Sequence, residues 1–480
     1  MKKFDLLKVL GITLLIVALI SWVVPAGIYS KGAFSSLEST IPIGLYDLFR
    51  LPYIAIATFI QFGLLFLAIG GFYGVLNKTG VYSKLVDALV EKVRNKNVFL
   101  IITILIFALL TSFVGSPNLI FILVPFFVAV LIKLGYSKMT AFAATVGAML
   151  IGQIGTTFGF STWGYLKYVF GVEMHSLIFE RIILLVIVLF LFILLVRKLS
   201  IKEISTKPSK KQKNKEEIKE EKIDIPLHKD TTSKKSFMPL VVMSILTFVI
   251  AAVGVYNWYY AFEIDFFTTL HDSIVSFEFG GQLILKNILG SVTEIGFFGN
   301  YDLMVILLIS SFIIGWIYGL KINDIFDGLK SGFKEMLKPA LYSMLACTVF
   351  TALLNMSSSG GDFVYTIIDK FISDSGQFSL AGTIGSGLIS SFAYNDFYTL
   401  AANLAGIFGS YDAEIIPAIS FIIQTMYSLV MVIAPTSIFL IAGLSYLDIP
   451  YKEWVKYIWK LLLAIFGIIV VIAFIITAMI

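Results

Sequence analysis

The sequence predicts an all-α integral membrane protein with about nine full transmembrane helices and two re-entrant hairpins, arranged as inverted-topology repeats with broken helices. Three observations support this prediction. Of the 480 residues, 58% are apolar and 14% are charged, whereas soluble domains carry about 25% charged residues. Many apolar runs reach the roughly 20 residues of a helical crossing. Two similar polar interruptions, "LLTSFVGSPN" at 109–118 and "LISSFAYNDF" at 388–397, stand inside apolar segments.

Nine apolar runs have the length of one full crossing. The first begins soon after "MKK" and is longer than the apolar core of a signal peptide, so we expect an uncleaved first helix. The charged stretch "YKEWVKYIWK" at 451–460 predicts an amphipathic helix at the membrane surface, just before the last run. The nine runs lie near 7–29, 54–77, 140–160, 178–197, 238–262, 303–320, 339–356, 415–447 and 461–480.

Two further segments, about 98–132 and 377–410, are too long for one crossing, and each has a polar interruption near its middle. We expect each to be a hairpin that returns to the side from which it entered. Lysines at 78–96 and 133–138 place both ends of the first hairpin in the cytoplasm. Acidic residues flank the second hairpin and place its ends outside. The same reasoning predicts a cytoplasmic N-terminus.

An internal repeat relates the two hairpins. At an offset of about 279 residues, "TSFVGSPN" aligns with "SSFAYNDF", and "IGTTFGF" at 154–160 aligns with "APTSIFL" at 434–440. Inverted repeats with interrupted helices are typical of secondary transporters, whose binding site lies at the repeat interface.

The predicted order is an N-terminal helix with an external connection (1–53), the first repeat (54–197), a linker (198–237), scaffold helices with an external segment at 263–302 (238–337), and the second repeat (338–480).

A polar stretch of low complexity separates the two halves. Residues 197–235 hold 13 Lys/Arg and 7 Asp/Glu, and such a stretch buries too little apolar surface to fold. We expect 198–237 to be a disordered basic linker in the cytoplasm. A lipid-binding or regulatory role is the alternative. Because this stretch carries the excess positive charge, the formal net charge of +5 does not indicate nucleic-acid binding.

The candidate binding residues lie at the hairpin tips and at breaks in the helices at 140–160 and 415–447. Backbone groups freed by a break at membrane depth are tolerated only where they line a cavity or are buried in protein, and they attract ions of both signs. The alternative is that these small polar residues only help helices to pack in lipid. The candidates are Ser112, Gly115, Ser116 and Asn118 at the first tip, Gln153, Thr156 and Thr157 at the first break, Ser391, Asn395 and Asp396 at the second tip, and Thr436 and Ser437 at the second break.

Asp396 is the most specific of these candidates. A carboxylate at membrane depth is costly and indicates a function. Asp396 could take up a proton, coordinate Na⁺ or pair with a cationic substrate, and the alternative is a helix cap facing a water-filled vestibule. The sequence shows no spacing of metal ligands such as HExxH and no GxxxxGK[ST] loop. It therefore predicts no metal and no cofactor apart from a coupling ion, and it excludes an ATP-driven pump.

These motifs resemble the bacterial four-carbon-dicarboxylate anaerobic carrier and basic amino-acid antiporter-like family, part of the wider ion transporter superfamily. The resemblance spans nearly the whole chain and rests on "SWVVPAGIY" at 21–29, "GGFYGVLNKTG" at 70–80, "FERII" at 179–183 and "YKEWVKYIWK". It implies proton- or sodium-coupled carriage, or exchange, of small carboxylates or amino acids by an elevator-like movement, often in dimers. The sequence departs from the family pattern at both hairpin tips. The first tip has "GSPN" where many members carry acidic residues, and the second tip has "AYNDF" where many members are rich in Ser and Gly.

The sequence thus predicts a secondary active transporter of a small charged metabolite, an amino acid or a carboxylate, in the bacterial inner membrane. The expected partners are the small-molecule substrate, the lipid bilayer and a second copy in a homodimer, with no nucleic acid. One alternative is an ion channel, against which two asymmetric half-sites argue. The other is an integral-membrane enzyme acting on lipid-linked substrates, but the sequence lacks a cluster of acidic or basic residues in membrane-edge loops. We therefore expect no enzyme activity.

Overall fold

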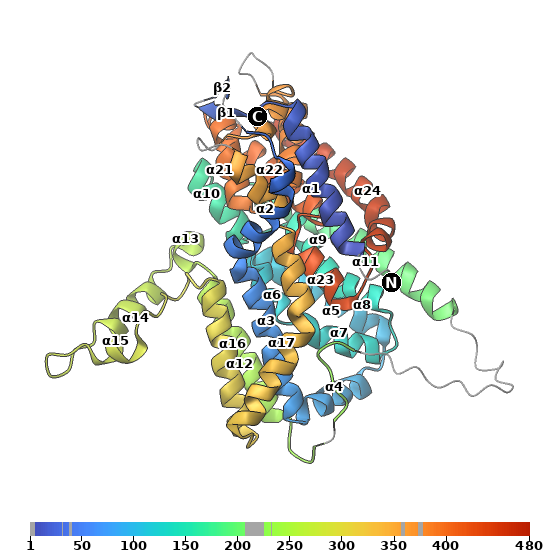
Figure 1. Cartoon of the computed structure of the whole chain (residues 1–480), viewed down its shortest axis with the longest axis vertical. Coiled ribbons are helices and arrows are strands. Elements are labelled where there is room, and N and C mark those ends of the chain that lie inside the picture. The colour runs from blue at the N-terminus through green and yellow to red at the C-terminus, as the bar shows by residue number, and fades with distance from the viewer. Residues whose placement is uncertain are drawn as a thin grey trace.

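The computed structural model shows a protein built almost entirely of helices (Figure 1). Eight helices of the described residues are long and apolar enough to cross a membrane. The predicted class, an all-α membrane protein, is confirmed, while the number of crossings stays a prediction. The structure describes residues 5–30, 32–37, 41–206, 225–231, 233–356, 361–372 and 378–480, and for 201–206 it describes the backbone alone.

The N-terminal part contains a short hairpin of two strands after its first helix. Strands β1 (Gly27–Ser30) and β2 (Ala33–Ser36) pair antiparallel, with Gly27 opposite Ser36. Trp22 at the end of the first helix donates through Nε1 to the carbonyl of Ile43, at 2.7 Å. The helices of this part are α1 (Asp5–Val23), α2 (Leu45–Thr58), α3 (Ile60–Lys78) and α4 (Val81–Lys92).

The segment predicted as the first hairpin breaks in its middle and returns to its starting point. Helix α5 (Lys96–Val114) ends at Gly115, and the chain continues through α6 (Pro117–Phe121) and α7 (Val124–Lys133). Lys96 Nζ donates to the carbonyl of Leu134 at 2.6 Å, so the two ends of the segment lie together. Pro117 at the first position of α6 suits a helix start, because proline has no N–H to leave unpaired there.

The next predicted crossing is also interrupted. It consists of α8 (Lys138–Phe142), the π-helical η1 (Ala143–Gly147) and α9 (Ala148–Ile154). After residues 155–159 the chain resumes with the π-helical η2 (Phe160–Gly164) and α10 (Tyr165–Phe170), then α11 (Ile178–Thr206). π-Helical turns are frequent at functional sites.

The second half shows the same order of breaks. Helices α20 (Leu380–Ala393) and α21 (Phe397–Phe408) flank residues 394–396, and α22 (Ile416–Met431) and α23 (Ile438–Leu447) flank residues 432–437. The flanking helices are α18 (Thr348–Met356), α19 (Phe363–Asp369) and α24 (Tyr451–Ala478). Helix α24 includes both the predicted surface stretch and the last predicted crossing. That the two halves are inverted relative to each other stays a prediction.

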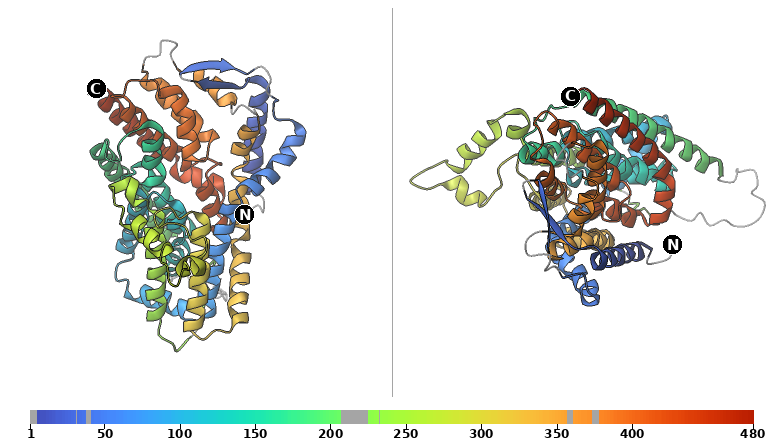
Figure 2. Two further views of the ribbon diagram at one scale, coloured as in Figure 1. Left: turned by 90° about the vertical axis from the view of Figure 1, so that its left-hand side faces the viewer. Right: turned by 90° about the horizontal axis from the view of Figure 1, so that it is seen from above.

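The middle of the chain forms a scaffold and an arm. Helices α12 (Met238–Val255) and α16 (Asn300–Ile317) pack against each other, and α16 packs against α3. Between them, α13 (Trp258–Phe262), α14 (Phe266–Val275) and α15 (Ile284–Leu289) form an arm, most of which projects from the rest of the molecule (Figures 1 and 2).

Helices α3 and α17 (Ile322–Leu345) pack closely through glycines. A Cβ added to Gly70 would lie 2.5 Å from the carbonyl oxygen of Gly332, and one added to Gly74 would lie 2.1 Å from that of Gly328. Small residues let two backbones approach this closely in a membrane protein. The stretch "GGFYGVLNKTG" therefore serves, at least in part, to pack α3 on α17.

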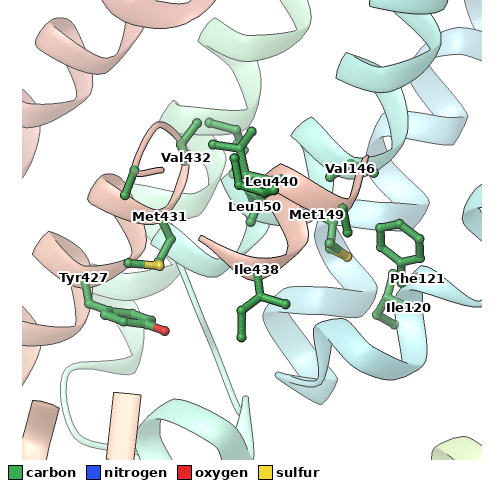
Figure 3. Close-up of a cluster of buried hydrophobic side chains, with 14 of the residues drawn as sticks. Ile120, Phe121, Val146, Met149, Leu150, Tyr427, Met431, Val432, Ile438 and Leu440 are labelled. Atoms are coloured by element: carbon green, nitrogen blue, oxygen red, sulfur yellow. The ribbon is translucent and has the colours of Figure 1, made fainter. Parts of the chain in front are cut away.

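The two broken helices pack against each other in the centre of the molecule. Figure 3 shows this core, in which side chains of α6, η1 and α9 meet those around the second break. Phe142 and Val146 lie against Gly443 of α23, where an added Cβ would come within 2.9 Å of both. Buried members of this core include Phe121, Met149, Leu150, Met431, Val432 and Leu440.

The end of the linker is packed, which corrects part of the prediction for 198–237. Leu227 is fully buried, and its N–H donates to Glu335 of α17 at 2.5 Å. Asn77 of α3 donates to the carbonyl of Leu227 and accepts from the N–H of Lys229, both at 3.0 Å. The "IPLH" stretch supplies apolar side chains that a fully solvated linker would lack. Residues 207–224 lie outside the described residues.

Candidate functional site

The first hairpin tip is bonded to the first helix break. Ser112 Oγ donates to the carbonyl of Gly155 at 2.8 Å. The N–H of Thr157 lies 3.0 Å from the carbonyl of Ser112 and 3.1 Å from its Oγ. Backbone groups freed by the two interruptions thus satisfy one another, as they must away from water.

Two glycines allow the tip and the break to touch. Gly115 ends α5 with a φ of 70°, a conformation that side chains disfavour. A Cβ there would lie 2.5 Å from the Cα of Gly159. Ser161 Oγ donates to the carbonyl of Gly115. Gly115 is therefore structural, since it shapes the tip without offering a side chain.

A cleft of about 570 Å³ opens between this tip and the scaffold. Its lining includes Ser116 and Asn118 of the first tip, and Ser116 Oγ makes no capping bond to α6. The amide oxygen of Asn118 has no hydrogen-bond partner among the described residues. The other polar lining residues are Gln61, Ser161, Tyr165, Tyr168, Asn257, Tyr260, Asn300 and Tyr398.

The scaffold contributes an unpaired donor to this cleft. Asn257 is almost fully buried; its Oδ1 accepts from the N–H of Tyr260 at 3.0 Å and so caps α13. Its Nδ2 has no partner among the described residues. A buried donor without a partner costs about 1–3 kcal/mol. This amide therefore suits a ligand that brings an acceptor oxygen.

The second tip places Asp396 at the start of α21. Asp396 Oδ2 accepts from the N–H of Thr399 at 2.8 Å and from its Oγ1 at 2.7 Å. The side chain is half-buried and caps the helix, as the structural alternative expected. It also lies close enough to Tyr165 to interact with it electrostatically. The prediction that Asp396 binds an ion stays a prediction.

The second tip and the second break are also joined. Tyr427 of α22 donates its hydroxyl to the carbonyl of Asn395 at 2.9 Å, and Thr436 Oγ1 lies 3.4 Å from the carbonyl of Phe392. Ser391 Oγ donates to Gly387 within its own helix, and Ser437 begins α23 without a side-chain capping bond.

One buried amide connects the two halves. Gln424 of α22 donates through Nε2 to the carbonyl of Gln153 at 2.7 Å, beside the first break. Thr156 Oγ1 donates to the same carbonyl at 2.7 Å. The backbone of Gln153 thus belongs to a network that crosses from one half to the other.

The structure brings some predicted residues to the cleft and uses others in packing. Ser116 and Asn118 line the cleft together with Tyr398, which follows Asp396 by two residues. The rings of Tyr165, at the start of α10, and Tyr398 of α21 lie 5.3 Å apart, so the chain that follows the first break and the second hairpin meet at this edge of the cleft. The remaining predicted residues include several whose side chains or backbone groups form hydrogen bonds with other protein groups. These are Ser112, Gln153, Thr156, Thr157, Ser391, Asn395 and Thr436.

Sequence reasoning missed several residues of this region. Gln424 is a polar residue in an apolar run, and the rule that selected Asp396 could have found it. Asn257, Tyr165 and Tyr398 carried no such signal. Asp362 is one of the acidic residues that flank the second hairpin, and its side chain is buried. Arg181 is also buried, with its guanidinium 3.7 Å above the ring of Trp163.

Electrostatically, the cleft is polar but uncharged, because none of its lining residues is Asp, Glu, Lys or Arg. Within the described ranges, no three His, Cys, Asp or Glu residues cluster as metal ligands would. A site of this kind binds by hydroxyl and amide hydrogen bonds.

Comparison with known proteins identifies a family, and solved structures with a similar fold include a transporter. No curated protein matches the chain. Among solved structures, the YdaH transporter of Alcanivorax borkumensis, described as having an unusual topology, is 12% identical. The alignment covers 97% of each chain with a TM-score of 0.40, too low to support an argument. The sequence matches the C4-dicarboxylate anaerobic carrier family over residues 4–480. The chain belongs to this family, as its motifs predicted, and it is a multi-pass membrane protein of the carboxylate-carrier class.

Proposed function

We propose that the protein is a secondary active transporter of four-carbon dicarboxylates, which bind in the cleft between the first tip and the scaffold. The observation that carries this proposal is the cleft itself. It combines the Ser116 hydroxyl and the Asn257 amide donor, neither of which has a side-chain hydrogen-bond partner in the part of the chain that the structure describes, with Tyr398 at the start of α21. Its volume of about 570 Å³ lies within the usual range of small-molecule sites.

The neutral lining supports coupling to a cation. A dicarboxylate carries two negative charges, and burying charge without a partner is costly. With no Lys or Arg in the lining, a co-transported H⁺ or Na⁺ would offset that cost. Asp396, half-buried beside Tyr165, is the candidate Na⁺ ligand next to the cleft.

The arrangement also supports an elevator-like cycle. The closely packed glycines of α3 and α17 would hold the scaffold rigid, while each tip is bonded to its own break and could move with it as one unit. The cleft lies between these two parts. Assembly as a homodimer in the bacterial inner membrane belongs to this proposal as well.

Uptake of radiolabelled succinate into proteoliposomes, under imposed proton or sodium gradients, tests the function. Asn257→Asp keeps the cap on α13 but replaces the donor with a repelling oxygen, so we expect at least a tenfold loss of uptake. Ser116→Ala removes one hydrogen bond to a charged ligand, about 1.5–3 kcal/mol, or 10- to 100-fold in affinity. Ser273→Ala, on the exposed face of α14, is the matched control and should transport normally.

Other outcomes would identify the alternatives. Flux that does not saturate with succinate would indicate a channel, and chemical conversion of a lipid-linked substrate would indicate an enzyme. Uptake of amino acids but not dicarboxylates would overturn the substrate assignment while keeping the carrier.

A further inference from the structure

One carboxylate of the second half is far more buried than Asp396. Asp362 is 4% exposed, and among the described residues it is the only Asp or Glu that is buried. It precedes α19 and lies beside strand β1, since the N–H of Gly27 donates to its carbonyl at 3.0 Å.

The carboxylate of Asp362 touches the tip of the second hairpin. Tyr394, two residues before Asp396, is buried and donates its hydroxyl to Asp362 Oδ2. The other oxygen, Oδ1, accepts from the N–H of Val364 at 2.7 Å. The side chain of Asn403 in α21 also lies close to this hydroxyl. A proton arriving at Asp362 would therefore change the bonding of the hairpin break directly.

No cation compensates this carboxylate among the residues that the structure describes. The titratable groups that face it are Tyr365 of α19 and Tyr394 of the hairpin. From β1, Tyr29 contacts the ring of Tyr365 and donates to Asp369 at 2.6 Å. Lys370 at the end of α19 is exposed. Burial raises the pKa of the Asp362 carboxyl to about 6, against the lowering effect of the Tyr394 hydroxyl and backbone N–H groups.

We propose that Asp362 is a proton-binding site of the transport cycle. Tyr394, at the tip of the second hairpin, changes its hydrogen bonding when Asp362 gains or loses a proton. In the ionised form, Tyr394 donates to Asp362. When Asp362 gains a proton, its new O–H can donate to the oxygen of Tyr394, and the tyrosine hydroxyl is released to another acceptor. The step moves one proton from solvent to one carboxylate oxygen and back. It deepens the proposed function, on which it rests, by naming the proton as a coupling ion.

Proton flux measured with a pH dye inside proteoliposomes tests this proposal on the full-length protein. We expect wild type to move protons with succinate and to accumulate succinate in response to a pH gradient. Asp362→Asn should lose gradient-driven accumulation at least tenfold, yet keep measurable succinate counterflow that no longer varies between pH 5 and 7. Asp369→Asn, at the end of α19, where the carboxylate accepts from the hydroxyl of Tyr29, is the matched control and should remain coupled.

Tyr394→Phe provides a second test that does not change the carboxylate. Losing the donated hydrogen bond destabilises the ionised form, so the pH at which transport is half-maximal should rise. If Asp362→Asn does not fold, an unchanged pH profile in Tyr394→Phe overturns the proposal. Gradient-driven accumulation retained in folded Asp362→Asn also overturns it. Absence of succinate counterflow in wild type would instead reject the proposed function.

Discussion

At the scale of single residues, two carboxylates of the second half differ in ways that the sequence hides. Asp396 stands within an apolar segment but is half-buried and caps α21. Asp362 follows a polar stretch that looks external, yet it is buried against the tip of the hairpin. The position of a residue within or outside an apolar segment is therefore a poor measure of its burial, because burial depends on which other elements pack against the residue.

Asp396→Asn separates capping from ion binding. Asn caps helices as well as Asp does, so the variant should fold. If Asp396 binds Na⁺, sodium-driven accumulation should fall at least tenfold while exchange persists. If it pairs with a cationic substrate, binding should weaken by about 3–5 kcal/mol. Transport that is normal at every pH and sodium concentration would leave Asp396 as a cap only.

Gln424 tests the bond between the two halves. Gln424→Ala removes the 2.7 Å hydrogen bond to the carbonyl of Gln153, to which Thr156 Oγ1 still donates, and one such bond contributes about 0.5–1.5 kcal/mol. We expect a lower melting temperature and weaker transport. Tyr53→Ala, on an exposed side chain of α2, is a control for general loss of stability. Unchanged melting and transport in Gln424→Ala would show that the halves do not need this bond.

At the scale of elements, glycines position the scaffold. Gly74→Ala would place a Cβ 2.1 Å from the carbonyl oxygen of Gly328, and overpacking of this kind costs about 1–3 kcal/mol. The melting temperature should fall by several degrees. Gly467→Ala in α24 has no neighbour within 4 Å and should leave melting unchanged or raise it. Equal melting of the two variants would contradict the close packing of α3 on α17.

The docked end of the linker should respond to pH. Burial, followed by the charge of Lys133, lowers the pKa of His228 below its usual value. The neutral form of His228 is therefore favoured while the segment is docked. The docked state has its full stability above about pH 6.5, and this stability is lost as the pH falls through the lowered pKa. Asp230, Asp87 and the ring of Tyr82 also face the imidazole.

Hydrogen exchange of residues 225–235, corrected for intrinsic rates, measures this effect. We expect protection at pH 7 that decreases toward pH 5, and a smaller decrease in His228→Gln. Protection that is equal at both values in wild type would contradict a docked, neutral His228.

At the scale of the whole molecule, the sequence predicted the helical membrane fold and the family because apolar runs and motifs are local signals. It also located the polar interruptions, and the structure shows a helix break at each of them. It could not show that Ser112 bonds across to Thr157, that Asn257 of the scaffold faces the first tip, or that "IPLH" docks on Asn77 and Glu335. Such contacts depend on long-range packing, which no short stretch encodes.

Substrate protection of a thiol in the cleft tests the central claim, that a dicarboxylate binds there, most directly. Cys347 is the single cysteine and is buried, so Cys347→Ala provides a background for Ser116→Cys in the cleft and Ser273→Cys on the arm. We predict that saturating succinate slows maleimide labelling of Ser116→Cys severalfold, whereas butyrate does not, and that labelling of Ser273→Cys is unaffected. Labelling of Ser116→Cys at the same rate with and without succinate, in a variant that still transports it, would contradict the claim.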